Sequence, residues 1–359
     1  MIHYVIQTTP QYNSTAAYNR VRLLYDGFVK NGYSSKLHLL IIPDETSFLK
    51  KCIVFVKCLF MMLSLLMIAD KTDIVIFYGE TLFSFMYKWF SRKTNLVVER
   101  LEYPYFMIIE NLSPKLAYIS KKNLKDMCYA SSMITCSSFL EKYYCEYVKD
   151  IYICPLVVKL NEFEKRRKEK KDEYIAYCGS FDNNKDGIPV LLKAFSIFHK
   201  QFSDVKLVLI GTGAEESLTK LKELIRKEEI DNCVEFTGLI PHSEIGDWLA
   251  NAVVLALARP NNKQAEGGIP SKVGEYLASG VPCVLTKTGD LSNYLQDGVD
   301  CFLCAPDSVE AFAERLKDCY LSNRSLIGQQ GKIAAKQFDY ECQAKKVAQY
   351  FENRYNIIL

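Results

Sequence analysis

Short runs of consecutive apolar residues alternate with amphipathic stretches along the first half of the chain. The strand-like runs are residues 4–7, 37–42, 74–78, 96–98 and 133–135. Residues 16–31 have helical periodicity and end at Asn31-Gly32, a typical C-cap signal. Continuous apolar runs are typical of strands that are covered by helices on both faces. The alternation therefore predicts βαβ units that build a parallel, doubly wound sheet.

The same alternation starts again after a run of charges at residues 161–172, N-E-F-E-K-R-R-K-E-K-K-D. This run predicts a solvated linker, and a basic patch for a membrane or a partner is the open alternative. We expect an N-terminal domain at 1–160, a linker at 161–173, a second domain at 174–338, and a C-terminal helix at 339–359 that packs back on the N-terminal domain. Two such domains would face each other across a cleft, where doubly wound folds bind ligands. Strands are predicted at 174–178, 206–210, 234–236, 253–258 and 283–286, and helices at 189–200, 215–229, 243–251, 271–279, 309–320 and 340–353.

Composition narrows the class of protein. A length of 359 residues suggests two domains, and 49% hydrophobic with 24% charged residues is typical of a soluble globular protein. The net charge of +3 is too small to indicate nucleic-acid binding. The thirteen cysteines are an odd number and many lie in apolar runs, so we expect reduced thiols in a cytoplasmic protein. Cys301 and Cys304 form a lone C-x-x-C without a second pair or a nearby histidine, so no metal site is predicted.

Residues 52–69 form the most apolar segment, interrupted by Lys57 and preceded by Lys50 and Lys51. We interpret it first as a buried helix before the strand at 74–78. Two alternatives stay open. One is an interfacial helix on the inner face of an anionic membrane, because a basic end with an apolar body suits that location. The other is a membrane-spanning helix, which Lys57 disfavours.

The segment at 264–282, Q-A-E-G-G-I-P-S-K-V-G-E-Y-L-A-S-G-V-P, has the strongest chemical signal. Gly267 and Gly268 let the backbone approach a ligand closely because they have no Cβ atom. Ser271 after Pro270 predicts an N-cap, which places unpaired amides and a positive helix end beside these glycines. Such a helix start binds phosphate, and the two oxygens of Glu275 could accept from both hydroxyls of a ribose. The segment predicts a nucleotide-sugar site.

Two further turns follow strands. Gly211 and Gly213 follow the strand at 206–210, but Glu216 stands where a dinucleotide fingerprint needs its third glycine, so we predict a turn that lines the site. The turn at 179–187, G-S-F-D-N-N-K-D-G, places Lys185 between a strand and a helix, where it could reach a phosphate. A solvated lysine is the alternative.

Residues 174–340 resemble the donor domain of the retaining GT-B-fold glycosyltransferases, the group that includes sucrose and bacterial polysaccharide transferases. The similar motifs are G-S-F-x-x-x-K-D-G at 179–187, L-V-L-I-G-T-G at 207–213, F-T-G-L-I at 236–240, A-N-A-V-V-L-A-L at 250–257, P-S-K-V-G-E-Y-L-A-S-G-V-P at 270–282 and D-G-V-D-C-F-L at 297–303. The first 150 residues resemble the acceptor domain only loosely, through Cys136–Ser138 and the segment near Pro155.

The resemblance implies an EC 2.4 hexosyltransferase that moves a sugar from a nucleotide diphosphate sugar with retained configuration, with no cofactor and no metal. It implies diphosphate contact by Lys185 and ribose contact by Glu275. It implies that backbone amides at Gly267, Gly268 and Ile269 hold the donor sugar and phosphate. The expected donor-binding set also includes Gly179, Ser180, Gly211, Gly213, Arg259, Glu266, Pro270, Ser271 and Lys272.

The chain departs from the family pattern at several positions. The family's first glutamate corresponds to Gly267, with Glu266 one residue earlier, and the family's arginine corresponds to Ser180. Lys272 or Arg259 is the expected substitute cation. The family's acceptor-side histidine is absent, and the stretch 99–104 lies in its place, which makes Arg100 and Glu102 the candidates for acceptor contacts.

The apolar segment at 52–69 and the basic linker together suggest a cytoplasmic enzyme that can touch the inner membrane face, where a lipid-linked acceptor would wait. With the resemblance, we expect transfer to a glycan or lipid-linked acceptor in cell-surface polysaccharide synthesis. Two alternatives stay open because fold does not fix function. One is a nucleotide-sugar epimerase, and the other is a non-catalytic partner subunit that binds nucleotide.

Overall fold

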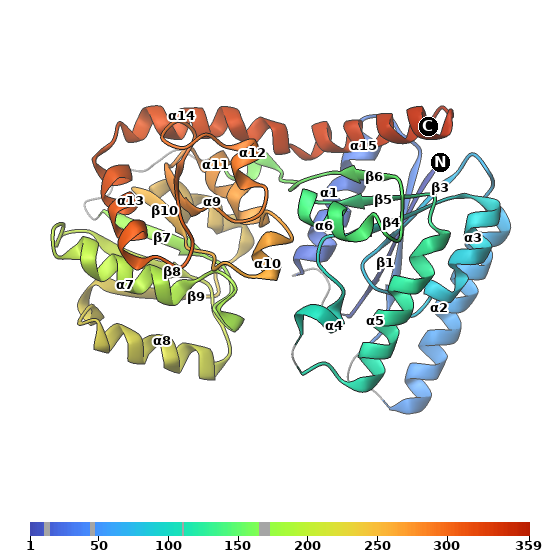
Figure 1. The fold of residues 1–359 in the computed structure, drawn as a ribbon, viewed down its shortest axis with the longest axis horizontal. Helices are drawn as coiled ribbons and strands as arrows, with labels where there is room; N and C mark the ends of the chain where they lie inside the picture. The colour runs from blue at the N-terminus through green and yellow to red at the C-terminus, as the bar shows by residue number, and fades with distance from the viewer. Residues whose placement is uncertain (11–14, 44–46, 110, 165–172) are drawn as a thin grey trace. The chain divides into compact units, whose positions relative to one another are not determined.

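The computed structural model describes residues 1–10, 15–43, 47–109, 111–164 and 173–359. The chain forms two compact units (Figure 1). The first consists of Met1–Val157 together with Phe338–Leu359, and the second is Val158–Gln337. Most of the charge run expected to be a linker, residues 165–172, lies outside the described residues.

The first unit contains a six-stranded sheet in the order β2-β1-β3-β4-β5-β6, and every neighbouring pair is parallel. Its strands are β1 Ile2–Thr8, β2 Ser35–Ile41, β3 Ile74–Tyr78, β4 Asn95–Arg100, β5 Ser132–Thr135 and β6 Ile151–Ile153. The first five were predicted within one or two residues at most ends. The three half-buried residues of β6 form an edge strand too short to give a pattern of its own.

Helices cover both faces of this sheet. On one face α1 Ala16–Lys30 and α15 Tyr340–Tyr355 pack over alternate strand residues such as Tyr4 and Ile76. On the other face, four helices pack over residues such as Val75 and Phe77. These helices are α2 Phe48–Ile68, α3 Tyr87–Lys93, α5 Pro114–Asp126 and α6 Ser138–Tyr144. The short helix α4 Tyr105–Ile108 follows β4 and contacts α5.

The helices α1 and α15 approach each other closely, although their sequences lie far apart (Figure 1). Gly27 makes this possible, because a Cβ atom there would lie 2.6 Å from Cβ of Ala344 and 2.6 Å from the carbonyl oxygen of Tyr340. Lys30 also forms an ion pair with Glu341 at 2.6 Å. The last helix is therefore an integral part of the first unit.

The helix α2 corrects the first interpretation of residues 52–69. It is one helix of 21 residues with mean hydropathy 2.2, long and apolar enough to cross a membrane, but only 17% of its most apolar stretch is buried. Cys58, Met62 and Leu65 lie in the core, while the opposite side is exposed. The expectation of a buried helix was wrong because apolar content alone does not show how many sides of a helix are covered.

The second unit contains a six-stranded parallel sheet in the order β12-β11-β10-β7-β8-β9. Its strands are β7 Tyr174–Cys178, β8 Lys206–Ile210, β9 Val234–Gly238, β10 Val254–Leu257, β11 Cys283–Thr286 and β12 Phe302–Cys304. When its strands are counted from β7, this sheet has the strand order of the doubly wound dinucleotide-binding fold. The predicted α/β class, with a doubly wound parallel sheet in each of two domains, is confirmed.

The helices of the second unit contact each other over the sheet. The helix α7 Ile188–His199 contacts α8 Glu215–Lys227 and α13 Val309–Leu321, and α11 Ser271–Ser279 contacts α9 His242–Asn251 and α14 Arg324–Ala335. The short helices are α10 Lys263–Glu266 and α12 Leu291–Tyr294. The helix α14 was not predicted, because its apolar residues are few and interrupted by glycines and glutamines.

Replacing Gly27 tests the packing of α15 on α1. We expect Gly27→Ala to lower the free energy of unfolding by about 1–3 kcal/mol, the usual cost of overpacking. This loss opposes the gain of about 1 kcal/mol that alanine brings to a helix interior. Urea unfolding followed by circular dichroism measures it. The control is Val29→Ala on the same helix, whose side chain is 50% exposed. A Gly27→Ala protein as stable as wild type would contradict the close packing.

Candidate functional site

The candidate site lies at the carboxyl ends of β7 and β10 in the second unit. These strands are neighbours, and the strand order reverses between them. In open parallel sheets, ligands bind outside the carboxyl ends of the strands at such a switch point. The turn at 179–187 follows β7, Arg259 follows β10, and α10 and α11 come next in the chain. The fold therefore brings the predicted donor-side segments to one edge of one sheet.

The turns after β7 and β8 contact each other through their backbones. The Gly179 N–H donates to the Ile210 carbonyl at 2.9 Å, and the Phe181 N–H donates to the Thr212 carbonyl at 3.0 Å. Gly211 is required here, because its φ is +130° and a Cβ atom would lie 2.0 Å from the carbonyl oxygen of Gly179. The structure thus brings together the predicted glycines of both turns, and Gly213 lies against Asp182.

Lys185 is exposed and lies in the turn between β7 and α7. It borders a hollow of about 320 Å³, which is also lined by Ser180, Asp186, Glu216 and Lys220. The turn ends at Gly187, which has φ +68° and whose Cβ atom would lie 1.8 Å from the carbonyl oxygen of Ala258. The backbone of the turn therefore rests directly on the end of β10, and Lys185 is carried at the edge of the sheet.

A buried polar cluster joins this turn to α11. Lys272 forms an ion pair with the Asp186 carboxylate, and its Nζ atom lies 3.3 Å from the Tyr177 hydroxyl and 4.9 Å from the centre of that ring. The Tyr177 hydroxyl lies 2.7 Å from Oδ2 of Asp186. Burial acts to raise the pKa of Asp186, but the charge of Lys272 and the hydrogen bonds to that carboxylate lower it overall.

Sequence reasoning missed Tyr177 and Asp186. A signal for Asp186 was present, since K-D-G at 185–187 places an acid beside a predicted phosphate-binding lysine. An acid at the start of a helix is common, however, and nothing in the sequence links it to Lys272. The contact depends on the tertiary fold.

Arg259 is buried and holds the loop before α11. Its guanidinium donates to the Gly268 carbonyl at 2.8 Å and to the Gln264 carbonyl at 3.2 Å, and Nε lies 3.9 Å from Oδ1 of Asp186. We expected Arg259 or Lys272 to substitute for the family's missing arginine. The structure instead engages both cations in internal contacts that shape the site.

The glycine pair differs from expectation in conformation. Gly267 ends α10 with φ −63°, and its N–H donates to the Lys263 carbonyl at 3.0 Å. Gly268 is not among the glycines with positive φ, and its carbonyl accepts from Arg259. The Gly267 amide thus donates within the protein, and its contact with a donor stays a prediction. Glu266 belongs to α10, in which Asn262 caps the first turn by accepting from the Ala265 N–H at 2.8 Å.

Ser271 is the first residue of α11 and not its N-cap. Pro270 takes the capping position with φ −69° and ψ 143°, and no side chain caps the helix. The extended backbone of Pro270 already sets the helix direction, so the serine moves into the first turn, where it is exposed. Its side chain forms a hydrogen bond with the side chain of Glu275, one turn further along the helix.

Glu275 lies on the side of α11 that contacts the short 3-10 helix at Leu160–Glu162. Burial raises the pKa of the Glu275 carboxyl, and the charge of Glu162 acts in the same direction. Lys272, His242 and the Ser271 hydroxyl oppose this rise. A partly exposed carboxylate near the Lys272 ammonium could accept hydrogen bonds from a ligand's hydroxyl groups.

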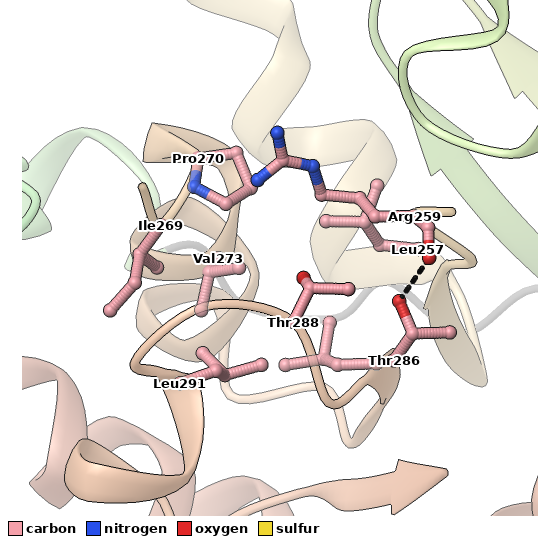
Figure 2. Close-up of a pocket in the computed structure, with 9 residues that line it drawn as sticks. Leu257, Arg259, Ile269, Pro270, Val273, Thr286, Thr288 and Leu291 are labelled. Carbon is pink, nitrogen blue, oxygen red and sulfur yellow. Dashed lines mark hydrogen bonds between the residues drawn. The ribbon is translucent and has the colours of Figure 1, made fainter. Parts of the chain in front are cut away.

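A small cavity of about 10 Å³ lies below the loop before α11. Figure 2 shows residues that line it: Leu257 and Arg259 at the end of β10, Ile269, Pro270 and Val273 around the start of α11, Thr286 at the end of β11, and Thr288 and Leu291 beyond it. The Thr286 hydroxyl donates to the Arg259 carbonyl at 2.8 Å. The volume suffices for about one water molecule. The cavity therefore supports the loop rather than holding a substrate.

The two acceptor candidates belong to the first unit. Arg100 ends β4 and is buried, and its guanidinium donates to the carbonyl of Glu99 at 2.9 Å and lies 3.4 Å from the Tyr87 hydroxyl. This placement argues against the prediction that Arg100 contacts an acceptor. Glu102 is exposed, and its carbonyl accepts from the Tyr144 hydroxyl at 2.8 Å. The role of its carboxylate stays a prediction.

All thirteen cysteines are free thiols. Cys301 and Cys304 are buried around β12, and burial raises the pKa of the Cys304 thiol to about 12. Among the residues that the structure describes, no three His, Cys, Asp or Glu side chains group as metal ligands would.

Comparison with known proteins agrees with this geometry. Residues 172–322 match the family model described as glycosyl transferases group 1. Among solved structures, sucrose-phosphate synthase from Thermosynechococcus elongatus superposes with a TM-score of 0.74 at 15% identity, covering 98% of this chain and 99% of that one. Anabaena HepE in complex with UDP gives 0.71 at 13% identity, covering 97% and 99%. WaaG, a glycosyltransferase involved in lipopolysaccharide biosynthesis, gives 0.70 at 11% identity, covering 98% and 99%. No curated protein sequence matches the chain.

The two parallel sheets and these likenesses show that the chain has the GT-B fold of these glycosyltransferases. The match to the group 1 glycosyl transferase model lies within the second unit.

Replacing Asp186 tests the cluster that joins the turn to α11. We expect Asp186→Asn to destabilise the protein by about 3 kcal/mol at neutral pH, because it leaves Lys272 without its buried partner. The pKa of Asp186 is lowered in the folded state. Its stabilising contribution is therefore present above the unfolded pKa of about 3.9 and is lost as pH falls through the lower folded value.

The difference in melting temperature between wild type and Asp186→Asn should thus be large at pH 7 and narrow below about pH 4. Differential scanning calorimetry across pH measures it. The control is Asp318→Asn, which removes an ion pair to Arg315 in which the acid is 44% exposed and should cost less than about 1 kcal/mol. If both substitutions lowered the melting temperature equally at pH 7, the buried Asp186–Lys272 pair would stabilise the protein no more than the exposed pair does.

Proposed function

We propose that this chain is a glycosyltransferase that moves a sugar from a nucleotide diphosphate sugar to a glycan or lipid-linked acceptor, with retention and without a required metal, in cytoplasmic synthesis of cell-surface polysaccharide. One observation carries the proposal. The Lys185 turn and the start of α11 with Glu275 lie at the switch point of the second unit and are joined by the Asp186–Lys272 ion pair.

The donor assignment draws on the relatives and on local chemistry. Two structures of Anabaena HepE hold UDP-glucose or UDP with glucose, and the pneumococcal O-GlcNAc transferase GtfA holds UDP and GlcNAc. A diphosphate would meet the Lys185 ammonium and the positive end of α11. Glu275, one turn into that helix, would accept from the two hydroxyl groups of the ribose. We therefore take UDP as the first probe.

The chemistry follows from the charge that develops on the leaving diphosphate. Lys185 and the helix start can stabilise this charge without reorganising, since the turn and α11 are already held in place. The acceptor hydroxyl would attack on the face from which the diphosphate leaves. The departing phosphate oxygen can then take the proton, so the new glycosidic bond forms as the sugar–phosphate bond breaks and the anomeric configuration is retained.

The acceptor is assigned to the first unit. WaaG is described as involved in lipopolysaccharide biosynthesis, and WaaB as a lipopolysaccharide outer core galactosyltransferase. These relatives favour a glycan or lipid-linked acceptor. Glu102 is the candidate contact, because Arg100 is buried. Thirteen free cysteines favour the reducing cytoplasm.

A transfer assay tests the proposal. The purified chain is first screened against a panel of sugar nucleotides by thermal shift, because a ligand that binds the folded state raises the melting temperature. The stabilising donor is then incubated with and without a lipid extract, and the products are identified by mass spectrometry. Transfer of the sugar is the expected result. An altered sugar nucleotide without any acceptor would indicate an epimerase, and binding with neither change would indicate a non-catalytic subunit.

Substituting the two donor-side residues tests their assigned contacts. We expect Glu275→Ala and Lys185→Ala each to weaken UDP binding by about 1.5–3 kcal/mol, the value of a hydrogen bond to a charged group. Isothermal titration calorimetry measures the change. Lys206→Ala, an exposed lysine at the start of β8 and so at the opposite end of the strand, is the matched control. Unchanged affinity in Glu275→Ala would remove the ribose assignment.

The role of metal is tested by chelation. We expect full transfer activity in excess EDTA, because the proposed charge stabilisation comes from a lysine and from backbone amides. The initial rate with the identified donor is measured before and after dialysis against EDTA, and again after magnesium or manganese is added. A rate that falls with EDTA and returns with either ion would contradict this part of the proposal.

A further inference from the structure

The outward side of α2 carries a continuous apolar stripe. Its side chains recur at three- and four-residue spacing, so they lie along one side of the helix. Between 40% and 70% of each is exposed: Leu49, Ile53, Val56, Phe60, Leu63 and Met67. Soluble proteins rarely expose an apolar stripe of this length, and such a surface marks a site of interaction.

The inward side of α2 packs against the rest of the first unit. Cys58, Met62 and Leu65 are buried in the core that covers the sheet. The Lys93 ammonium on α3 donates to the carbonyls of Leu66 and Met67 at 3.0 Å, which fixes the end of the helix. A membrane-spanning position would strip these core contacts from the sheet. The helix can therefore present its stripe to a partner only while it lies flat on the unit.

The helices around the stripe are strongly basic. Together α2, α3 and α5 carry ten Lys and Arg residues and one acid, Asp126, whereas the whole chain has 45 Lys and Arg against 42 Asp and Glu. Asp126 is buried and paired with Lys122 at 2.8 Å. The three helices pack over the same face of the sheet (Figure 1). Positive charge is thus concentrated on the side of the unit that bears the stripe.

Two aromatic side chains outside α2 are also partly exposed. Phe85 is 37% exposed and Trp89 is 46% exposed, and the two rings meet edge-on. Phe85 contacts the buried Phe83, on which Phe55 of α2 stacks, so these rings are joined to α2 through the core. Tryptophan is enriched where apolar and aqueous phases meet, because its ring is apolar and its N–H is polar.

We propose that the stripe on α2 docks on the surface of an anionic lipid bilayer. The helix lies in the interface plane, with the stripe toward the acyl chains and Lys50 and Lys57 toward the headgroups. A protein partner would need an acidic face with an apolar groove of matching length. A bilayer offers both features along its whole surface, and apolar burial with attraction to anionic lipid gives reversible binding. This surface inference does not rest on the proposed function.

Vesicle flotation with the full chain tests the inference. Vesicles contain phosphatidylcholine alone or phosphatidylcholine with phosphatidylglycerol, at low and high salt. We expect binding to the anionic vesicles that weakens with salt, because salt screens exposed charges. Phe60→Gln/Met67→Gln should reduce the partition coefficient at least tenfold, since each side chain loses apolar burial. Lys50→Ala and Lys57→Ala should each reduce it roughly fivefold on anionic vesicles and leave neutral vesicles unaffected.

The matched control is Ile333→Gln, which changes an apolar side chain that is 57% exposed on α14 in the other unit. Melting temperatures confirm that all variants fold. A second measurement uses Trp248→Phe, which leaves Trp89 as the single tryptophan of a chain that has two. Its emission should shift to shorter wavelength with anionic vesicles and be quenched by brominated lipid.

Three outcomes overturn the inference. The first is wild-type protein that does not float with anionic vesicles at low salt. The second is a Phe60→Gln/Met67→Gln protein that binds as well as Ile333→Gln. The third is a dimer in sedimentation velocity that Phe60→Gln abolishes, without vesicle binding, which would assign the stripe to a second copy of the chain. None of these measurements depends on sugar transfer, so they can fail or succeed independently of the proposed function.

Discussion

The ion pair between Lys272 and Asp186 joins two segments that lie 86 residues apart in the sequence. One is the turn after β7 and the other is the first turn of α11, and both lie at the point where the strand order reverses. Removing either partner would leave a charge in a nearly dry site, which is much more costly than losing a surface pair. The same contact that stabilises the second unit therefore sets the distance between Lys185 and the start of the helix. Tyr177 adds a neutral partner that orients both groups.

Backbone proximity is the second constraint at this site. Gly187 lies against the carbonyl of Ala258, and Gly211 lies against the carbonyl of Gly179. Side chains at these positions would push apart the ends of three neighbouring strands. The ion pair can form only because the backbones come this close, so the glycines and the charges act as one arrangement. Arg259 completes it by holding the loop before α11 through two carbonyls.

Much of the fold could be predicted from the sequence, and the reasons differ between elements. The strands β7, β8 and β11 match their predicted bounds, because continuous apolar runs between turn residues leave few alternatives. The strand β6 and the helix α14 were missed because their patterns are short or interrupted. For α2 the apolar pattern was evident, but its exposed side was not, because hydrophobicity does not show which of its sides a helix packs against other elements.

At the site, motif spacing predicted that Lys185 and Glu275 lie at the same edge of the second sheet. The Asp186–Lys272 pair and the burial of Arg100 could not be predicted, because they depend on tertiary packing. Ser271 shows a finer limit: Pro270 competes for the same capping position.

The discontinuous make-up of the first unit has a consequence for biosynthesis. Its core includes Ala344, Val347 and Phe351 from α15, yet all of Val158–Gln337 is translated before that helix. Domains usually fold as units while the chain is synthesised from its N-terminus. Here the first unit must wait with one side of its sheet partly uncovered until the second unit has left the ribosome. A nascent chain halted before residue 338 would therefore expose the surface that α1 shares with α15, and a chaperone would have a defined apolar target on it.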